Sequence, residues 1–278
     1  MRFISVSALF LLVSQALVSA QAQTLSAPSL PNPNSVFLED LTWVEVRNAI
    51  AAGKTTAIIP TGGTEQNGPH MVIGKHNYLV RYKAGEIAKL LGNAIVAPVM
   101  AYVPEGEIPG PKPAAGHMRF PGTITTPEDA YEKVLEYAAR SLKNAGFLDI
   151  ALVGDSGGNQ AGQKAVAEKL NKEWAGTSVR VHHLTAYYPG RGDDIAMANG
   201  MSKEAVGSHA GSQDTTSLLY LNPGMLRIDK FSLGKANDGQ GHVGDPRAAT
   251  AAIGKLILEA QIADGAKQIQ ELRISSRK

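Results

Sequence analysis

Residues 55–76 read TTAIIP-TGGTEQNGPH-MVIGKH, and this stretch decides how the chain folds and where its site lies. Its first part is a short run of β-branched and apolar residues, which is typical of a buried strand. The glycine-rich turn that follows places polar side chains at the carboxyl edge of a sheet, where open α/β folds hold their sites. Glu65, His70 and His76 are residue types that bind metals or transfer protons. The stretch therefore predicts a functional site.

Strand-like and helix-like segments alternate along the rest of the chain. Apolar runs predict strands, while amphipathic periodicity, capping residues and glycine stops predict helices. The expected strands are 55–60, 94–99, 149–153 and 179–184, and the expected helices are 43–52, 77–91, 127–145, 160–174, 211–221 and 247–262. This alternation predicts an α/β fold with a mostly parallel sheet and helices on both faces. A long Pro/Gly loop over 102–122 is expected to be functional, since such loops are uncommon inside compact domains.

Two of the helices have explicit start signals. Thr42, followed three residues later by Glu45, predicts a capping box. Thr126 is expected to cap the helix whose first residue would be Pro127.

Composition limits the class of protein. With 44% hydrophobic and 19% charged residues in a chain of 278, one globular domain with a full core is expected. A formal net charge of +2 and an aromatic content of 6% leave neither a basic stripe nor stacking platforms, so no nucleic-acid partner is expected. Because the chain has no cysteine, a metal site would have to use His, Asp, Glu or Asn.

The first 22 residues resemble a secretory signal peptide. Arg2 precedes an apolar stretch over 3–18, and small residues around Ala20 and Ala22 offer cleavage sites. A membrane anchor is the alternative, but the apolar run is short and interrupted by serines, whereas a spanning helix needs ~20 apolar residues. Residues 23–35 predict a flexible leader, and 36–278 predict a single domain. We therefore expect a periplasmic or secreted protein that leaves the membrane after cleavage.

Further polar residues follow a strand or lie in loops. Asp155 and Ser156 belong to GDSGGN at 154–159, where the glycines could also serve only to start a helix close to the sheet. His209 lies in GSHAG at 207–211, shortly before Asp214, and His117 lies in the long loop.

Ser156 allows a second interpretation of the site. GDSGG nearly matches the Gly-x-Ser-x-Gly elbow of serine hydrolases, on a predicted strand–turn–helix. Asp214 and His242 would then follow in the order acid, base. A metal-independent serine hydrolase therefore remains an alternative.

Four segments, in the correct order, resemble the creatininase family (creatinine amidohydrolase-like hydrolases). The family motifs are Pro-x-Gly-[Ser/Ala]-x-Glu-Gln-His-Gly-Pro-His-x-Pro-x-x-x-Asp, a His before Phe-Pro-Gly-Thr, Asn-Gly-His-Gly-Gly-Asn, and His-Ala-Gly-x-x-Glu-Thr-Ser. They correspond here to residues 60–76, His117 with 120–123, 154–159 and 209–216. The segment GDPRAAT at 244–250 is also similar to the family.

The resemblance implies a three-layer α/β/α fold, a two-metal site with zinc or manganese, hydrolysis of cyclic or linear C–N amide bonds, and a homo-oligomer. Glu65 is an unchanged ligand, whereas Asn67, His76, Ser156 and Asp214 stand where the family has His, Asp, His and Glu. Asn and Ser are poor zinc ligands, so we expect at most one divalent metal per chain.

These assignments give a predicted site with three roles. The expected metal ligands are Glu65, His76, Asp155 and Asp214, the expected catalytic residues are His117, Ser156 and His209, and the expected substrate-binding residues are Asn67, His70 and Asn159. We expect an exported hydrolase that acts on a small molecule. The alternative is a non-catalytic descendant of the family that binds a small molecule in the same cleft.

Overall fold

A computed structural model describes residues 34–110 and 116–276 of the chain. All of them belong to one unit, Pro31–Lys278. The predicted signal peptide and most of the predicted leader lie outside the described residues. The predicted domain start at residue 36 stays a prediction.

Four parallel strands form the central sheet, in the order β2-β1-β3-β4. Their bounds are β1 Thr56–Thr61, β2 Ala94–Val96, β3 Asp149–Gly154 and β4 Arg180–His183. In the register of the sheet, Ile58 of β1 lies opposite Val96 of β2 and Ala151 of β3. Parallel strands cannot be joined by tight hairpins, so the helices lie in the crossovers between them.

The described residues contain eight α-helices. Their bounds are α1 Trp43–Ala51, α2 Lys75–Leu91, α3 Glu128–Ala145, α4 Gln160–Glu173, α5 Gly192–Ala198, α6 Lys203–Val206, α7 Ser212–Leu221 and α8 Ala251–Ser275. Sequence periodicity did not predict α5 and α6, because helices of 7 and 4 residues are too short to show it. Helix α8 also continues beyond its predicted end at residue 262, with Ala266 and Ile269 buried in the core.

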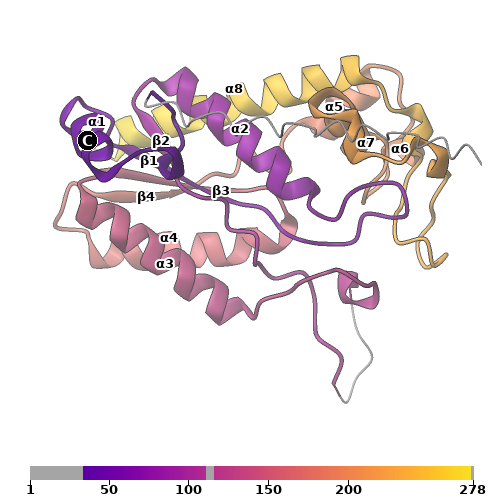
Figure 1. Cartoon of the computed structure of the whole chain (residues 1–278), viewed down its shortest axis with the longest axis horizontal. Coiled ribbons are helices and arrows are strands. Elements are labelled where there is room, and N and C mark those ends of the chain that lie inside the picture. Colours follow the sequence, from indigo (N-terminus) through magenta and orange to yellow (C-terminus); the bar gives the residue numbers. More distant parts are fainter. Residues whose placement is uncertain (1–33, 111–115, 277–278) are drawn as a thin grey trace, which may run out of the picture. The chain divides into compact units, whose positions relative to one another are not determined.

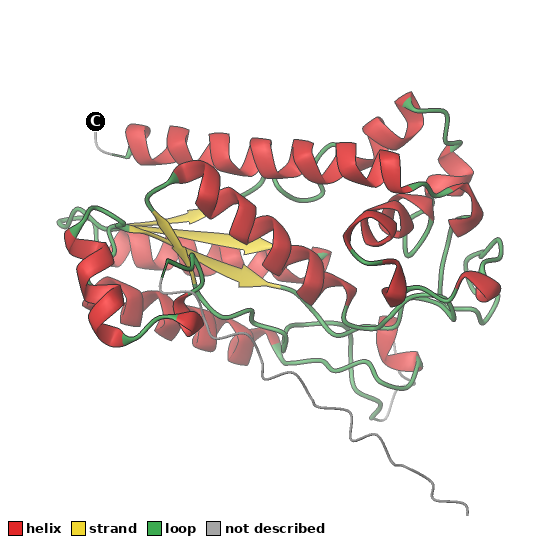
Figure 2. Cartoon of the chain, turned by 45° about the horizontal axis from the view of Figure 1, so that its top comes forward, coloured by secondary structure: helices red, strands yellow, loops and turns green. Residues whose placement is uncertain are grey.

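Side chains of the strands alternate between two apolar clusters, one on each face of the sheet. Figures 1 and 2 show the helices that lie on both faces. Ile58 and Val153 belong to the cluster that α2 and α8 cover, whereas Ile59 and Leu152 belong to the cluster that α3 and α4 cover. This alternation is the two-residue period of a strand with both faces buried. The expected three-layer α/β/α architecture is confirmed.

One of the two predicted helix starts has the expected form. At α1, Glu45 N–H donates to Thr42 Oγ1 (3.4 Å) and Thr42 N–H donates to Glu45 Oε2 (2.7 Å), which is the predicted capping box. At α3 the predicted cap is wrong by one residue, because Pro127, with ψ 146°, is itself the N-cap. Thr126 instead contacts the long loop, since its N–H donates to the carbonyl of Val103 (3.1 Å).

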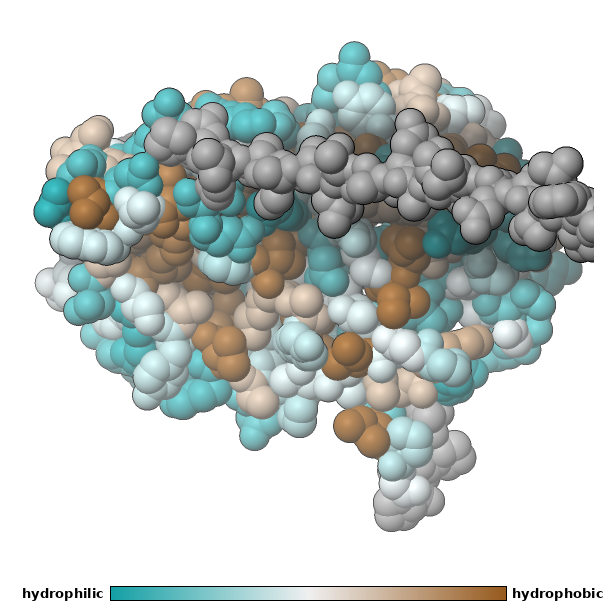
Figure 3. All heavy atoms as spheres, viewed as in Figure 1, coloured by the Kyte–Doolittle hydropathy of each residue, from teal (hydrophilic) through white to brown (hydrophobic). Residues whose placement is uncertain are grey.

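Apolar and hydrophilic residues are interspersed on the face shown in Figure 3. Exposed apolar side chains include Trp43, Leu90 and Ile108, which lie on different elements. Within residues 34–110 and 116–276, no helix has the length and apolar character needed to cross a membrane.

The sheet core generates a stability prediction. Replacing Ile58, which is 0% exposed, with Ala should lower the free energy of unfolding by about 2–5 kcal/mol, because a cavity is left between β1 and its helices. The matched control Leu90→Ala removes a side chain that is 61% exposed on α2, and should change stability by no more than about 0.5 kcal/mol. Urea unfolding monitored by circular dichroism measures both. Equal losses in the two variants would contradict the assigned core.

Candidate active site

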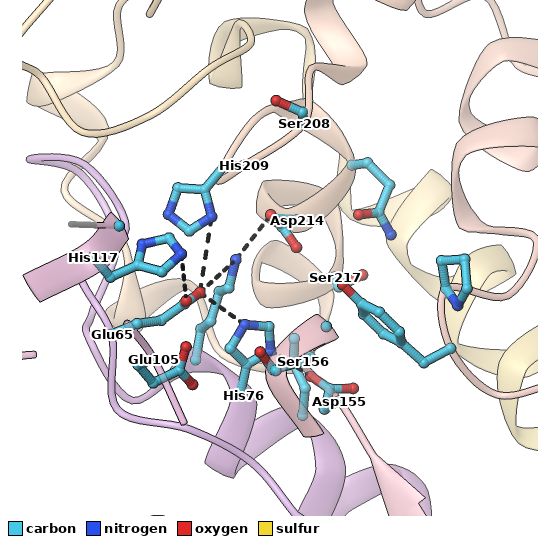
Figure 4. A pocket seen from close by; sticks show the side chains of 18 of the residues that line it. Glu65, His76, Glu105, His117, Asp155, Ser156, Ser208, His209, Asp214 and Ser217 are labelled. Atoms are coloured by element: carbon cyan, nitrogen blue, oxygen red, sulfur yellow. Dashed lines mark hydrogen bonds and ion pairs between the residues drawn. The ribbon is translucent and has the colours of Figure 1, made fainter. Parts of the chain in front are cut away.

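The candidate active site lies at the carboxyl ends of β1 and β3, which are neighbours in the sheet. The loop after β1 carries Glu65, and Asp155 directly follows β3. The first turn of α2 brings His76 between them (Figure 4). A cavity of about 830 Å³ opens here, lined from the loop after β1, α2, the long loop and α7. The parallel sheet thus gathers segments that are distant in sequence, as expected for this edge.

Glu65 is the residue on which the site converges, and only 2% of it is exposed. Its Oε1 lies 2.8 Å from His76 Nε2 and 3.7 Å from Lys75 Nζ, and its Oε2 lies 3.0 Å from His117 Nε2. Burial acts to raise the pKa of Glu65, but the charge and hydrogen bond of His76 and the charge of Lys75 outweigh burial and hold the pKa far below its usual range. Glu65 is therefore a carboxylate.

His76 bridges two carboxylates. Its Nε2 lies 2.8 Å from Glu65 Oε1, and its Nδ1 lies 2.9 Å from Asp155 Oδ2. A carboxylate can only accept, so both ring nitrogens must carry a hydrogen, as in the imidazolium form. Burial and the charge of Lys75 lower the pKa of His76, yet Glu65 and the two hydrogen bonds raise it to about 9.

Asp155 is held by three donors. Besides His76, Lys83 Nζ lies 2.5 Å and the Tyr187 hydroxyl 2.6 Å from its Oδ1. Although burial raises the pKa of Asp155, the Lys83 charge and the His76 hydrogen bond bring it down to about 2. Both oxygens of Asp155 are thus engaged by protein groups.

Lys75 pairs with Asp214 on the opposite wall of the site. Its Nζ donates to Asp214 Oδ2 (2.9 Å), which also accepts from the backbone N–H of Ala210 (2.7 Å). This pair ties the start of α2 to the start of α7.

His117 and His209 complete the cavity from two loops, with ring centroids 4.5 Å apart. His209 Nε2–H donates to the carbonyl of Gln66 (2.9 Å), so its Nδ1 keeps a lone pair, and Nδ1 lies 3.8 Å from Glu65 Oε1. Burial lowers the pKa of His117, and burial together with the charge of Lys75 lowers that of His209 to about 4. Both rings are therefore neutral near pH 7, as metal ligands must be.

One group in the described part of the chain has donor atoms close enough to share a metal ion. Glu65, His117 and His209 offer one atom each, all within 4.8 Å of one another. A carboxylate and two imidazoles suit zinc, which in catalytic sites keeps a fourth position for water. The backbone hydrogen bond of His209 is also the arrangement that orients metal-binding histidines. The donor set therefore fits a single divalent ion.

The predicted ligand set only partly coincides with this group. Glu65 is common to both, and His117 and His209, predicted as catalytic, are the other two members. The oxygen and nitrogen atoms of His76 and Asp155 are taken by hydrogen bonds within the protein, and Asp214 is paired with Lys75. The assignment of His76, Asp155 and Asp214 as metal ligands stays a prediction.

The three residues predicted to bind substrate are fully buried and do not line the cavity. The Asn67 amide donates to the carbonyls of Glu65 (3.0 Å) and Val72 (3.2 Å). His70 Nε2–H donates to the Ala210 carbonyl (3.0 Å), and Asn159 Oδ1 accepts from the N–H of Ser156 (3.1 Å). Their observed contacts stabilise the loops around the site, and their role in binding stays a prediction.

Ser156 lines the cavity beside Asp155 (Figure 4). Across the described residues, its hydroxyl has no hydrogen bond to a histidine ring. His242, the base in the serine alternative, bonds through Nε2 to the Ser232 carbonyl (2.9 Å) and packs against His70 instead.

Sequence reasoning missed Lys75, Lys83 and Glu105. The signal for the lysines was present, because both fall on the buried stripe of α2 with Leu79. Glu105, in the long loop, carries no such signal. It lies so close to Gly63 that any Cβ there would collide with its Oε1. Burial and the neighbouring Glu65 charge raise the pKa of Glu105 to about 9, so its neutral carboxyl retains a hydrogen to donate.

The sequence matches the family described as Creatininase, creatinine amidohydrolase, over residues 39–269. The chain belongs to the creatininase family. A mycofactocin precursor peptide peptidase of Mycolicibacterium smegmatis is 27% identical over 235 residues, covering 77% of this chain and 83% of the relative. The creatinine amidohydrolase of Pseudomonas putida is 29% identical over 116 residues, covering 39% of this chain and 43% of that protein. The resemblance inferred from the four motifs is confirmed.

Solved structures of creatininases share the fold. One named Creatininase Mn gives a TM-score of 0.69 at 24% identity, covering 85% of this chain and 98% of that chain. A creatininase mutant described as the Zn-Zn type gives a TM-score of 0.69 at 22% identity, with the same coverage of 85% and 98%.

The buried ring of His70 predicts a pH dependence of stability. Burial and the nearby His242 lower the pKa of His70 to about 4, against about 6.5 for an unperturbed histidine. Between these values the unfolded chain binds a proton that the folded chain does not, so stability falls as pH falls through this window. His70→Gln, which cannot titrate, should show a shallower loss of unfolding free energy between pH 6.5 and pH 4 than the wild type. Urea titrations across this range test the difference, and identical slopes would contradict it.

Proposed function

We propose that this chain hydrolyses a C–N amide bond of a small molecule or short peptide. Amidohydrolase chemistry is that of the family, and both relatives carry names of enzymes that cleave such bonds. The observation that carries the proposal is the convergence of Glu65, His117 and His209 on one cavity.

The cavity supports a substrate larger than one small ring. Its volume of about 830 Å³ is at the upper end of the usual range for ligand pockets, which is roughly 300–1,000 Å³. The peptidase name of the Mycolicibacterium relative agrees with a substrate of this size. Short peptides therefore belong in any substrate panel, beside creatinine.

One zinc or manganese ion is proposed to complete the site on Glu65, His117 and His209. Creatininases of known structure include a manganese form and a Zn-Zn form. When bound, such an ion supplies a Lewis acid for the amide carbonyl and a water of lowered pKa. Groups of the chain itself orient these ligands. His76 orients Glu65 and keeps it ionised, and the Gln66 carbonyl fixes the ring of His209.

We expect Glu65→Gln to reduce amide hydrolysis by at least about 100-fold, since it removes the charged ligand that the two histidines share. Chelation with EDTA should have the same effect, and zinc or manganese should restore activity. Ser156→Ala is the matched control, because it changes a cavity residue outside the ligand group and should retain activity within a few-fold. Mass spectrometry of products from creatinine and a library of short peptides measures all three.

Two results would contradict the proposed metal-dependent amide hydrolysis, each in favour of a different alternative. An activity that survives chelation but is lost in Ser156→Ala would favour the serine hydrolase. Ligand binding in the cavity, with no turnover of any compound tested, would favour a non-catalytic descendant of the family.

We further propose that the protein is exported and acts in the periplasm or outside the cell. The charged, apolar and small-residue segments of residues 1–22 support this. Self-association stays a prediction from the family resemblance, open to light scattering.

Export predicts a shortened chain. Protein recovered from the expressing bacterium should begin directly after Ala20 or Ala22, because the small residues there form the cleavage sites. Intact-mass measurement locates the first residue. A mass that includes Met1 would contradict cleavage.

A further inference from the structure

Lys75 places a buried ammonium group among the carboxylates of the cavity. Only 2% of the residue is exposed, yet it lines the cavity. Its Nζ lies 2.9 Å from Asp214 Oδ2 and 3.7 Å from Glu65 Oε1. The ammonium therefore occupies the space between two carboxylates, one from the loop after β1 and one from the first turn of α7, which is where a metal-binding site would place a cation.

The position of Lys75 in its helix also points to a role for its charge. It is the first residue of α2, and a cation is disfavoured at a helix N-terminus by the partial positive charge there. Burial of an ammonium group is unfavourable as well unless it is paired. Both costs are offset by Glu65 and Asp214, so the lysine and the two carboxylates form one unit.

A second lysine on the same helix pairs with a third carboxylate of the cavity, Asp155. Lys83 Nζ lies 2.5 Å from Asp155 Oδ1 and also donates to Gln261 Oε1 (3.1 Å). Asp155 is therefore already neutralised by protein groups. Lys75 is the ammonium group that faces both Glu65 and Asp214, while His76 contacts Glu65 from the side of Asp155.

We propose that the Lys75 ammonium is a built-in cation that takes the place of a second metal ion. Like charges repel at short range in a buried site, so a divalent ion cannot share the space between Glu65 and Asp214 with the ammonium. The chain then binds a single divalent ion and supplies the second positive charge itself. This inference rests on the proposed function for the position of the first ion, on Glu65, His117 and His209.

Zinc stoichiometry tests the proposal without a substrate. The mature chain is stripped with EDTA, dialysed against zinc and analysed for metal, with calorimetric titration as a second count. Wild type should bind one zinc ion per chain. Lys75→Ala and the longer neutral variant Lys75→Gln should each bind one ion more, because the carboxylates lose their counter-charge. Lys89→Ala, an exposed lysine on the same helix, is the matched control and should bind one.

The outcomes separate this inference from the proposed function. Two ions in the wild type, or no gain in folded Lys75→Ala and Lys75→Gln, would overturn the role of Lys75. No zinc in the wild type would contradict the metal site of the proposed function, yet a gain of one ion in the neutral variants would still support Lys75. If circular dichroism shows that neither neutral variant folds, the wild-type count decides, since one ion supports the proposal and two overturn it.

Discussion

The bridge from Glu65 through His76 to Asp155 is the interaction on which the site depends. It joins the ends of two neighbouring strands through one ring, with distances of 2.8 and 2.9 Å. Carboxylates this deeply buried are tolerated only when cations and donors satisfy them. Removing one partner of a buried ion pair typically costs about 3–5 kcal/mol, because the other charge is left without compensation. The bridge therefore links the stability of this edge of the sheet to the ionisation of Glu65.

The other charged groups are arranged around that bridge. Lys83 and Tyr187 hold Asp155 from α2 and from the segment after β4, while Lys75 ties α2 to Asp214 on α7. Together these contacts fix the first half of α2 against two loops and one helix. Among the described residues, the ion pairs of His117 and His209 are those with Glu65, and the Gln66 amide nitrogen lies 3.1 Å from His117 Nδ1. Glu65, His117 and His209 are also the group whose donor atoms lie close enough together to share an ion.

The chain shares the fold of creatininases, while some of its polar residues differ from those that the family motifs expect. The family match covers residues 39–269, and the described creatininases superpose at a TM-score of 0.69. Yet His76 and Ser156 stand at positions where the resemblance expects Asp and His, and lysines lie nearby. An imidazolium and two ammonium groups bring positive charge to Glu65, Asp155 and Asp214. The fold depends on the apolar alternation of the strands, which these substitutions leave unchanged.

The sequence alone determined the α/β class, the order of strands and long helices, and the strand ends that carry Glu65 and Asp155, because these follow from local periodicity and glycine turns. The four motifs also determined the family.

Tertiary structure decided which polar residues meet. The sequence places Lys75, Lys83 and Glu105 in a helix stripe and a loop, and only packing shows that they share one cavity with Glu65. Packing also shows that both ring nitrogens of His76 are hydrogen-bonded to carboxylates, and that His70 and Asn67 are buried outside the cavity lining. Which residues become hydrogen-bond partners across long sequence distances depends on how the loops pack over the end of the sheet. Local sequence patterns contain no information on that packing.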